Sequence, residues 1–98
     1  METERLMIKT KPYDSADYLD SEKAIVAYLK VAFEEGDADD IRAALGAVAR
    51  ARGMTGLSKE TGVAREALYK ALGKEGNPTL DTLLAVTRAL GVKLSVAA

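Results

Sequence analysis

The chain has 98 residues, of which 48% are hydrophobic and 5% aromatic, and its formal net charge is −1. This length predicts one domain with a modest core of Ala, Leu and Val. The sequence contains neither Cys nor His, which excludes disulfides and thiolate sites and removes the commonest general base and metal ligand. We therefore expect no metal or cofactor. No apolar run approaches the roughly 20 residues of a membrane span, so we also expect a cytoplasmic protein.

The small net charge hides an uneven distribution. Residues 14–40 hold nine acidic and two basic residues, whereas residues 41–74 hold seven basic and two acidic ones. This division suits two partners, phosphates at the basic segment and a basic molecule at the acidic one. An acidic coat on a solvated helix gives the same pattern, and both interpretations stay open.

The N-terminal third predicts a strand and a helix. Residues 6–11 alternate loosely and predict a short edge strand that Pro12 ends. Ser21 is a predicted N-cap for a helix that runs to about Glu35 and stops at Gly36. The inward stripe of this helix is Ile25, Leu29 and Ala32, and its apolar surface is broadened by Tyr28, Val31 and Phe33.

A second helix is predicted from Asp37, its N-cap, to about Arg52, with Gly53 as its end. Its inward positions are Ile41, Leu45, Val48 and Ala49. The aspartates at its start do not form a calcium loop, because Ile41 and Arg42 stand where an EF-hand needs an oxygen ligand and a glycine.

Residues 54–72 predict two short helices around a turn at Gly62, a residue free to adopt the left-handed conformation. Leu57 and Thr61 share the inner face of the first helix, and Val63 points inward from the turn. The predicted inner face of the second helix is Ala64, Leu68, Ala71 and Leu72, which leaves Arg65, Glu66, Tyr69, Lys70 and Gly73 outside. This layout is typical of a helix-turn-helix DNA reader, although an ordinary helical hairpin has the same pattern.

The last third predicts a loop, a helix and a strand. Thr79 caps a helix that Gly91 ends, with an inward set of Leu80, Leu83, Leu84, Val86, Thr87 and Leu90. Residues 92–96 alternate and predict a strand that pairs with residues 6–11, within one chain or between two subunits. Leu80, Leu84 and Val96 exceed what a small core requires, which predicts a homodimer surface.

Ser58, Gly62, Val63 and Leu68 resemble the helix-turn-helix core of the phage-repressor, or Xre, family. Three segments further resemble its addiction-module antidote proteins, which are related to HigA-type antitoxins: KPYDSADYLDSEKAIVAYL, ARARGMT and LYKALGKEGNPTLDTLL. Two positions depart from the pattern. Ser58 stands where the family usually has Ala, and Gly56, where a longer polar residue is common, weakens its helix by about 1 kcal/mol relative to Ala.

The resemblance implies an all-α fold, lambda-repressor-like, with an N-terminal helical extension and a short two-stranded sheet from the chain termini. Residues 1–36 would be the extension and 37–98 the DNA-binding domain, with its motif at 54–73, in one compact unit. Carried over by position, the DNA base contacts are Ala64, Arg65, Glu66, Tyr69 and Lys70, and the phosphate contacts are Thr55, Lys59 and Lys74.

The resemblance also implies an antitoxin that represses its own promoter and binds a small basic ribonuclease toxin of the RelE/HigB type. The acidic, aromatic-containing N-terminal segment supplies the toxin-binding candidates, which are Tyr13, Asp14, Asp17, Tyr18 and Asp20. No catalytic constellation is present, so we expect no enzyme activity. Two alternatives remain: a solitary phage-type transcriptional regulator without a toxin, and a toxin-binding protein that has lost DNA affinity.

Overall fold

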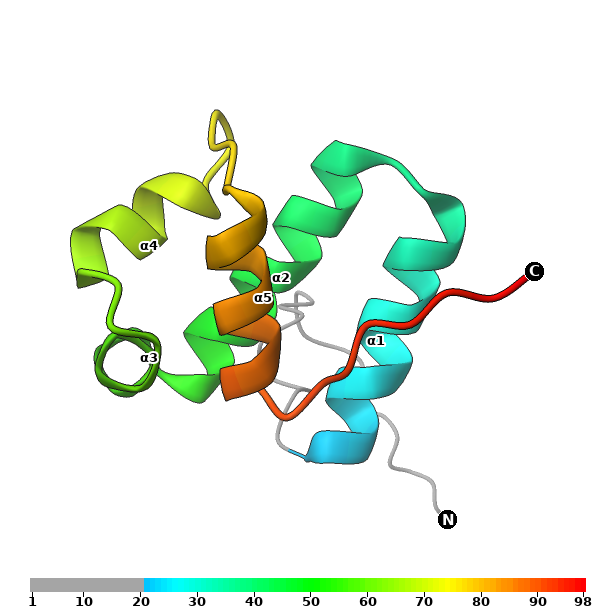
Figure 1. The fold of residues 1–98 in the computed structure, drawn as a ribbon, viewed down its shortest axis with the longest axis horizontal. Coiled ribbons are helices and arrows are strands. Elements are labelled where there is room, and N and C mark those ends of the chain that lie inside the picture. Colours follow the sequence, from blue (N-terminus) through cyan, green and yellow to red (C-terminus); the bar gives the residue numbers. More distant parts are fainter. Residues whose placement is uncertain (1–20) are drawn as a thin grey trace, which may run out of the picture.

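The computed structural model describes residues 21–98, and this part of the chain is all helical. Figure 1 shows α1 on one side, α3 and α4 on the other, and α2 and α5 between them. The helices are α1 Glu22–Glu35, α2 Ala38–Arg52, α3 Met54–Thr61, α4 Arg65–Ala71 and α5 Leu80–Ala89. The predicted all-α class is therefore confirmed for the described residues. None of these helices is long and apolar enough to cross a membrane.

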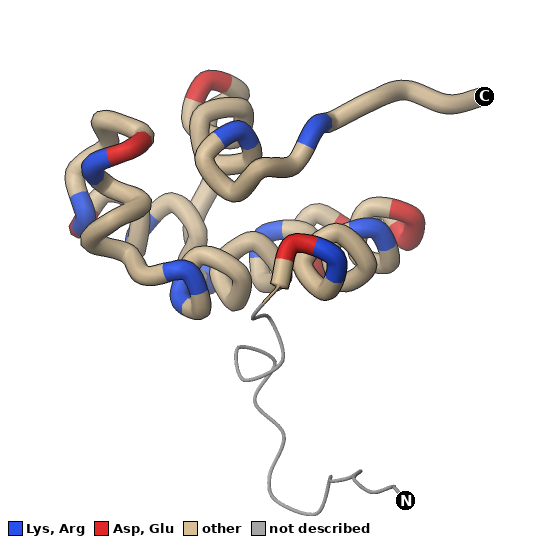
Figure 2. The backbone as a smooth tube through the Cα atoms, turned by 90° about the horizontal axis from the view of Figure 1, so that it is seen from below, with Lys and Arg blue, Asp and Glu red and all other residues tan. Residues whose placement is uncertain are grey.

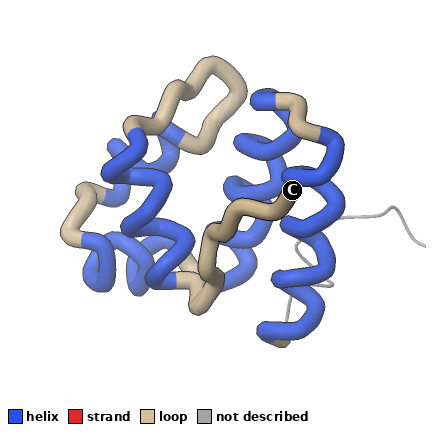
Figure 3. The backbone as a smooth tube through the Cα atoms, turned by 45° about the vertical axis from the view of Figure 1, so that its right-hand side comes forward, coloured by secondary structure: helices blue, strands red, loops and turns tan. Residues whose placement is uncertain are grey.

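The C-terminal segment differs from its prediction. Residues 92–96 form no strand, and Figure 3 shows only helices and loops between residues 21 and 98. The backbone N–H groups of Gly91 and Val92 donate to the carbonyls of Arg88 and Thr87, so the start of the segment closes α5 in a Schellman motif. The rest runs beside α1 (Figure 1). The other predicted strand, residues 6–11, lies outside the described residues.

The three longer helices begin at the residues that the sequence predicts. In each, a side-chain oxygen accepts a hydrogen bond from a backbone N–H two or three residues further on, at 2.8–3.1 Å, and the caps are Ser21, Asp37 and Thr79. Gly36 and Gly62 end α1 and α3 with φ of 76° and 77°, in the left-handed region that favours glycine. These predicted helix ends are confirmed.

One hydrophobic cluster joins all five helices. Helix α1 packs on α2, and α3 contacts α2, α4 and α5. Each fully buried large side chain contributes about 1.5–3 kcal/mol by leaving water. The core residues are Ile25, Leu29, Ala32, Ala44, Leu45, Ala47, Val48, Ala49, Met54, Leu57, Leu68, Leu72, Val86 and Leu90.

Three positions predicted to face inward are exposed instead. Ala64 is the N-cap residue of α4, with φ −57° and ψ 142°, so its four-residue spacing from Leu68 does not place it on the inner face. Leu80 and Leu84 in α5 are the other two, and they are 67% and 37% exposed. Val96 in the tail, which was not predicted to face inward, is fully exposed. Leu80, Leu84 and Val96 do exceed the core, as predicted, but the dimer that they would form stays a prediction.

Two arginines of the basic segment stabilise the fold. The Arg52 guanidinium donates to the carbonyls of Ala89 and Leu90 at 3.0 and 3.2 Å, which satisfies the end of α5. Arg42 donates to the Lys74 carbonyl at 2.7 Å and thereby ties the loop between α4 and α5 to α2. The count of seven basic residues therefore overstates the charge directed at an external partner.

Candidate nucleic-acid interface

The turn between α3 and α4 is fixed by side chains of α3 itself. The backbone N–H of Gly62 donates to the Ser58 carbonyl at 2.9 Å. The Ser58 hydroxyl donates to the Val63 carbonyl at 2.6 Å, and the Val63 N–H donates to the Thr61 hydroxyl at 3.1 Å. These three hydrogen bonds all lie within residues 58–63, so the direction in which the chain enters α4 is defined locally.

Apolar side chains anchor the two short helices on either side of the turn. Leu57 in α3 and Leu68 in α4 are fully buried, and Val63 between them packs against the core, as predicted. Helix α4 has seven residues and no side-chain hydrogen bond at its N-cap. Isolated helices shorter than about 12–15 residues are marginal in water, so packing through Leu68 and Leu72 supplies most of the stability of α4.

The outer face of α4 carries the predicted base-contacting residues. All five are exposed: Ala64, Arg65, Glu66, Tyr69 and Lys70. The Arg65 guanidinium carbon lies 5.1 Å from the centroid of the Tyr69 ring, and Arg65 Nη2 lies 3.4 Å from the Tyr69 hydroxyl. This is a cation–π pair, and its polar contact uses one of the five N–H donors of arginine. The pair restrains a long side chain before any ligand binds, which lowers the entropy cost of binding.

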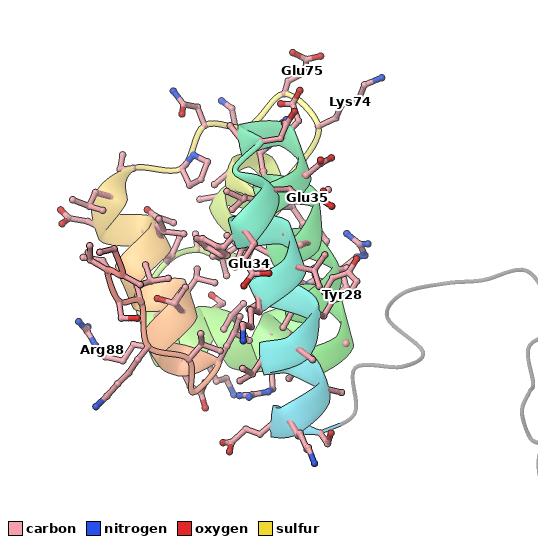
Figure 4. All side chains as sticks on the ribbon, turned by 90° about the vertical axis from the view of Figure 1, so that its right-hand side faces the viewer. Tyr28, Glu34, Glu35, Lys74, Glu75 and Arg88 are labelled. Atoms are coloured by element: carbon pink, nitrogen blue, oxygen red, sulfur yellow. The ribbon has the colours of Figure 1, made fainter. Side chains whose placement is uncertain are left out.

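The predicted phosphate contacts lie in two different surroundings. Thr55 and Lys59 are exposed on α3, next to the turn. Lys74 lies in the loop after α4 (Figure 4), in a hollow whose lining holds three acidic and three basic residues: Asp39, Asp40, Glu75, Arg42, Arg50 and Lys74 itself. Lys59 lies next to the turn and is therefore the better placed of the two lysines.

Acidic residues gather at one end of the part of the chain that the structure describes. Figure 2 shows acidic positions at the turn between α1 and α2, away from the side that carries α3 and α4. Basic residues on α3 and α4 outnumber the acidic residues there, and they are Lys59, Arg65 and Lys70 against Glu60 and Glu66. Within residues 21–98, no group of three or more His, Cys, Asp or Glu side chains is arranged to hold a metal ion.

Three residues that support this surface are not identified by sequence reasoning. Ser58 stands out in the sequence as the small residue of the helix-turn-helix pattern and not for its hydroxyl, which bridges the turn. Arg42 and Arg52 count simply as basic residues, whereas their partners are carbonyls 32 to 38 residues away. A small polar residue four before a turn glycine is the one local signal for Ser58, and no local signal marks the arginines. The toxin-binding candidates at residues 13–20 lie outside the described residues.

Fold and surface together define a small protein that is all helical over residues 21–98 and presents a short, polar and partly basic helix on a fixed turn. Residues 9–98 match the model of a family described as "probable addiction module antidote protein", and the chain belongs to this family. It is similar to an uncharacterised protein of Haemophilus influenzae, with 42% identity over 86 residues that cover 88% of this chain and 89% of the relative. No solved structure matches the chain. The family indicates an antitoxin role and implies a toxin partner.

Proposed function

We propose that the protein is the antitoxin of a type II toxin–antitoxin pair, which binds operator DNA, represses its own promoter and neutralises a small basic ribonuclease toxin of the RelE/HigB type. Membership of the antidote family is the observation that carries the antitoxin part. The protein acts by binding and catalyses no reaction. A direct complex would neutralise the toxin if it covers the basic side chains with which a ribonuclease holds RNA.

The DNA-binding part of the proposal is supported by the α3–α4 geometry. On this proposal the two helices form a helix-turn-helix unit of the Xre type, and α4 enters the major groove. Arg65 reads a guanine, Glu66 accepts from a cytosine or orients Arg65 or Lys70, and Ala64 contacts a thymine methyl. Tyr69 and Lys70 reach bases or phosphates, while Thr55, Lys59 and Lys74 contact phosphates and fix the register.

Useful specificity requires two copies, because one short helix reads only a few base pairs. We propose a homodimer on a palindromic operator, with the two α4 helices about 34 Å apart, one turn of DNA. The exposed side chains of Leu80, Leu84 and Val96 support this proposal, because exposed apolar side chains favour contacts between copies. A monomeric mass across micromolar concentrations would contradict it.

Co-expression tests the antitoxin proposal. The untagged chain is expressed with a tagged product of the small gene beside its own, and the eluate and the growth of the cells are both measured. We expect a stoichiometric complex and relief of the growth arrest that the neighbouring product causes. If no complex forms and the chain still shifts its own promoter DNA in a salt-dependent manner, the protein is a solitary regulator and the antitoxin proposal is wrong.

A further inference from the structure

A groove between α1 and α2 lies on the side of the molecule away from α3 and α4. Its volume is about 350 Å³, and its walls combine apolar side chains with two carboxylates. The apolar part is formed by Tyr28, Val31 and Ala43, and Val31 is 58% exposed although it is aliphatic. Glu35 and Asp40 form the acidic part. Figure 4 looks onto α1 and shows Tyr28, Glu34 and Glu35 along it.

Both charged side chains that line this groove, Glu35 and Asp40, are acidic. Five of the seven residues from 34 to 40 are acidic, and none is basic: Glu34, Glu35, Asp37, Asp39 and Asp40. Asp39 is engaged by Arg42 at 2.7 Å, and Asp37 caps α2. The remaining three carboxylates, on Glu34, Glu35 and Asp40, make no ion pair with any residue between 21 and 98. Negatively charged side chains therefore lie beside an apolar recess.

A second groove on α1 provides a contrast. It lies between α1 and the C-terminal segment, and its lining includes Val26 and Phe33 together with Lys30, Lys93 and Glu34. Two lysines and one glutamate leave it without the single sign that a basic partner requires. These two recesses therefore differ in the charge of the side chains that line them.

We propose that the groove between α1 and α2 is the docking surface for the toxin, a protein that presents an apolar side chain flanked by lysines and arginines. This inference rests on the proposed antitoxin function. The apolar side chain enters beside Tyr28 and Val31, and the basic side chains meet Glu35 and Asp40. Burial of the apolar contact supplies affinity, and the carboxylates accelerate and orient the encounter. The groove includes no residue of α3 or α4, so the toxin would contact residues other than those proposed to read DNA bases.

Two substitutions in the groove test the proposal without disturbing the fold. Val31→Lys places a positive charge on an exposed position in the recess. Glu35→Lys reverses a charge in the last turn of α1, where a lysine complements the helix dipole and so maintains the helix. The matched control is Val26→Lys, which makes the same change at a 46% exposed position on α1 that lines the other groove.

Separate cultures make the comparison quantitative and avoid mixed dimers of variant and wild-type chain. Each variant, and in parallel the wild-type chain, is expressed alone with the tagged product of the neighbouring gene, and the amount of captured chain per tagged partner is measured by mass spectrometry. We expect wild-type chain to exceed Val31→Lys and Glu35→Lys by about tenfold or more, and to equal Val26→Lys. Promoter binding and thermal unfolding of all three variants should match the wild-type protein.

Several outcomes would overturn the proposal, and they differ from one another. Equal capture of Val31→Lys, Glu35→Lys and wild-type chain would show that the toxin binds elsewhere while the antitoxin function stands. If Val31→Lys and Val26→Lys lose capture to the same extent, the toxin-docking surface cannot be assigned to this groove. If the wild-type chain itself is not captured, the proposed toxin binding fails, and the docking surface fails with it.

Discussion

The α1–α2 pair and the α3–α4 pair are stabilised in different ways. Helices α1 and α2 have 14 and 15 residues, and a side chain caps the start of each. Helices α3 and α4 have eight and seven residues, and neither has a side-chain hydrogen bond at its N-cap. Local signals therefore suffice to define the first pair, whereas the second depends on core packing and on the polar turn. A small change in that turn should alter the outer face of α4 and leave α1 and α2 intact.

The largest expected effect comes from Leu68→Ala, which removes the central anchor of α4. Leu68 is fully buried, so the variant should lose about 2–5 kcal/mol of unfolding free energy in urea and most promoter binding. Val31→Ala is the control, because a 58% exposed side chain should change stability by less than about 0.5 kcal/mol. Equal midpoints for the two variants would refute the dependence of α4 on packing.

Arg65→Ala should remove the preference for the natural operator over one altered at a single guanine, a loss of about 1–3 kcal/mol. Fluorescence anisotropy with both duplexes at fixed salt measures this preference. Lys74→Ala serves as the control, since a phosphate contact carries no sequence information and its loss should weaken both duplexes equally. Unchanged operator selectivity in Arg65→Ala would rule out base reading by this side chain.

Two glycines of the α3–α4 unit should respond in opposite directions to the same substitution. Gly62 has φ 77°, so Gly62→Ala should cost about 1–2 kcal/mol of unfolding free energy. Gly56 lies inside α3 with open space where the methyl group of an alanine would lie, so Gly56→Ala should stabilise by about 0.5–1 kcal/mol. Chemical denaturation distinguishes the signs, and stabilisation by Gly62→Ala would show that the left-handed turn does not depend on glycine.

The smallest effect is expected from Ser58→Ala. The variant loses the hydrogen bond to the Val63 carbonyl, worth about 0.5–1.5 kcal/mol, and recovers up to about 0.5 kcal/mol through the higher helix propensity of alanine. A net loss below about 1 kcal/mol should accompany faster amide exchange at Val63. Unchanged exchange at Val63 would mean that the hydroxyl does not hold the turn.

Much of the fold can be predicted from sequence because its signals are local. Ser21, Asp37 and Thr79 satisfy N–H groups two or three residues away, and Gly36 and Gly62 need only their own backbone freedom. Contacts over 30 or more residues leave no such signal, which is why the sequence does not predict the roles of Arg42 and Arg52.

One error in the predictions has the same long-range origin. Residues 92–96 alternate as a strand does, but the packing of this segment depends on where α1 lies. Ala64 fits a helical spacing, although the helix begins one residue later. The prediction that the outer residues of α4 are exposed is correct, since helical period alone decides which face they share.

The two proposed binding surfaces should act independently in one chain, and a single cross-comparison tests this most directly. Arg65→Ala and Val31→Lys are each measured for binding to promoter DNA and for capture by the tagged product of the neighbouring gene. We expect that Arg65→Ala loses operator preference and is still captured by the tagged product. We expect that Val31→Lys keeps operator preference and is no longer captured. If either variant loses both activities while remaining folded, the two surfaces are not separate and the proposed division of function is wrong.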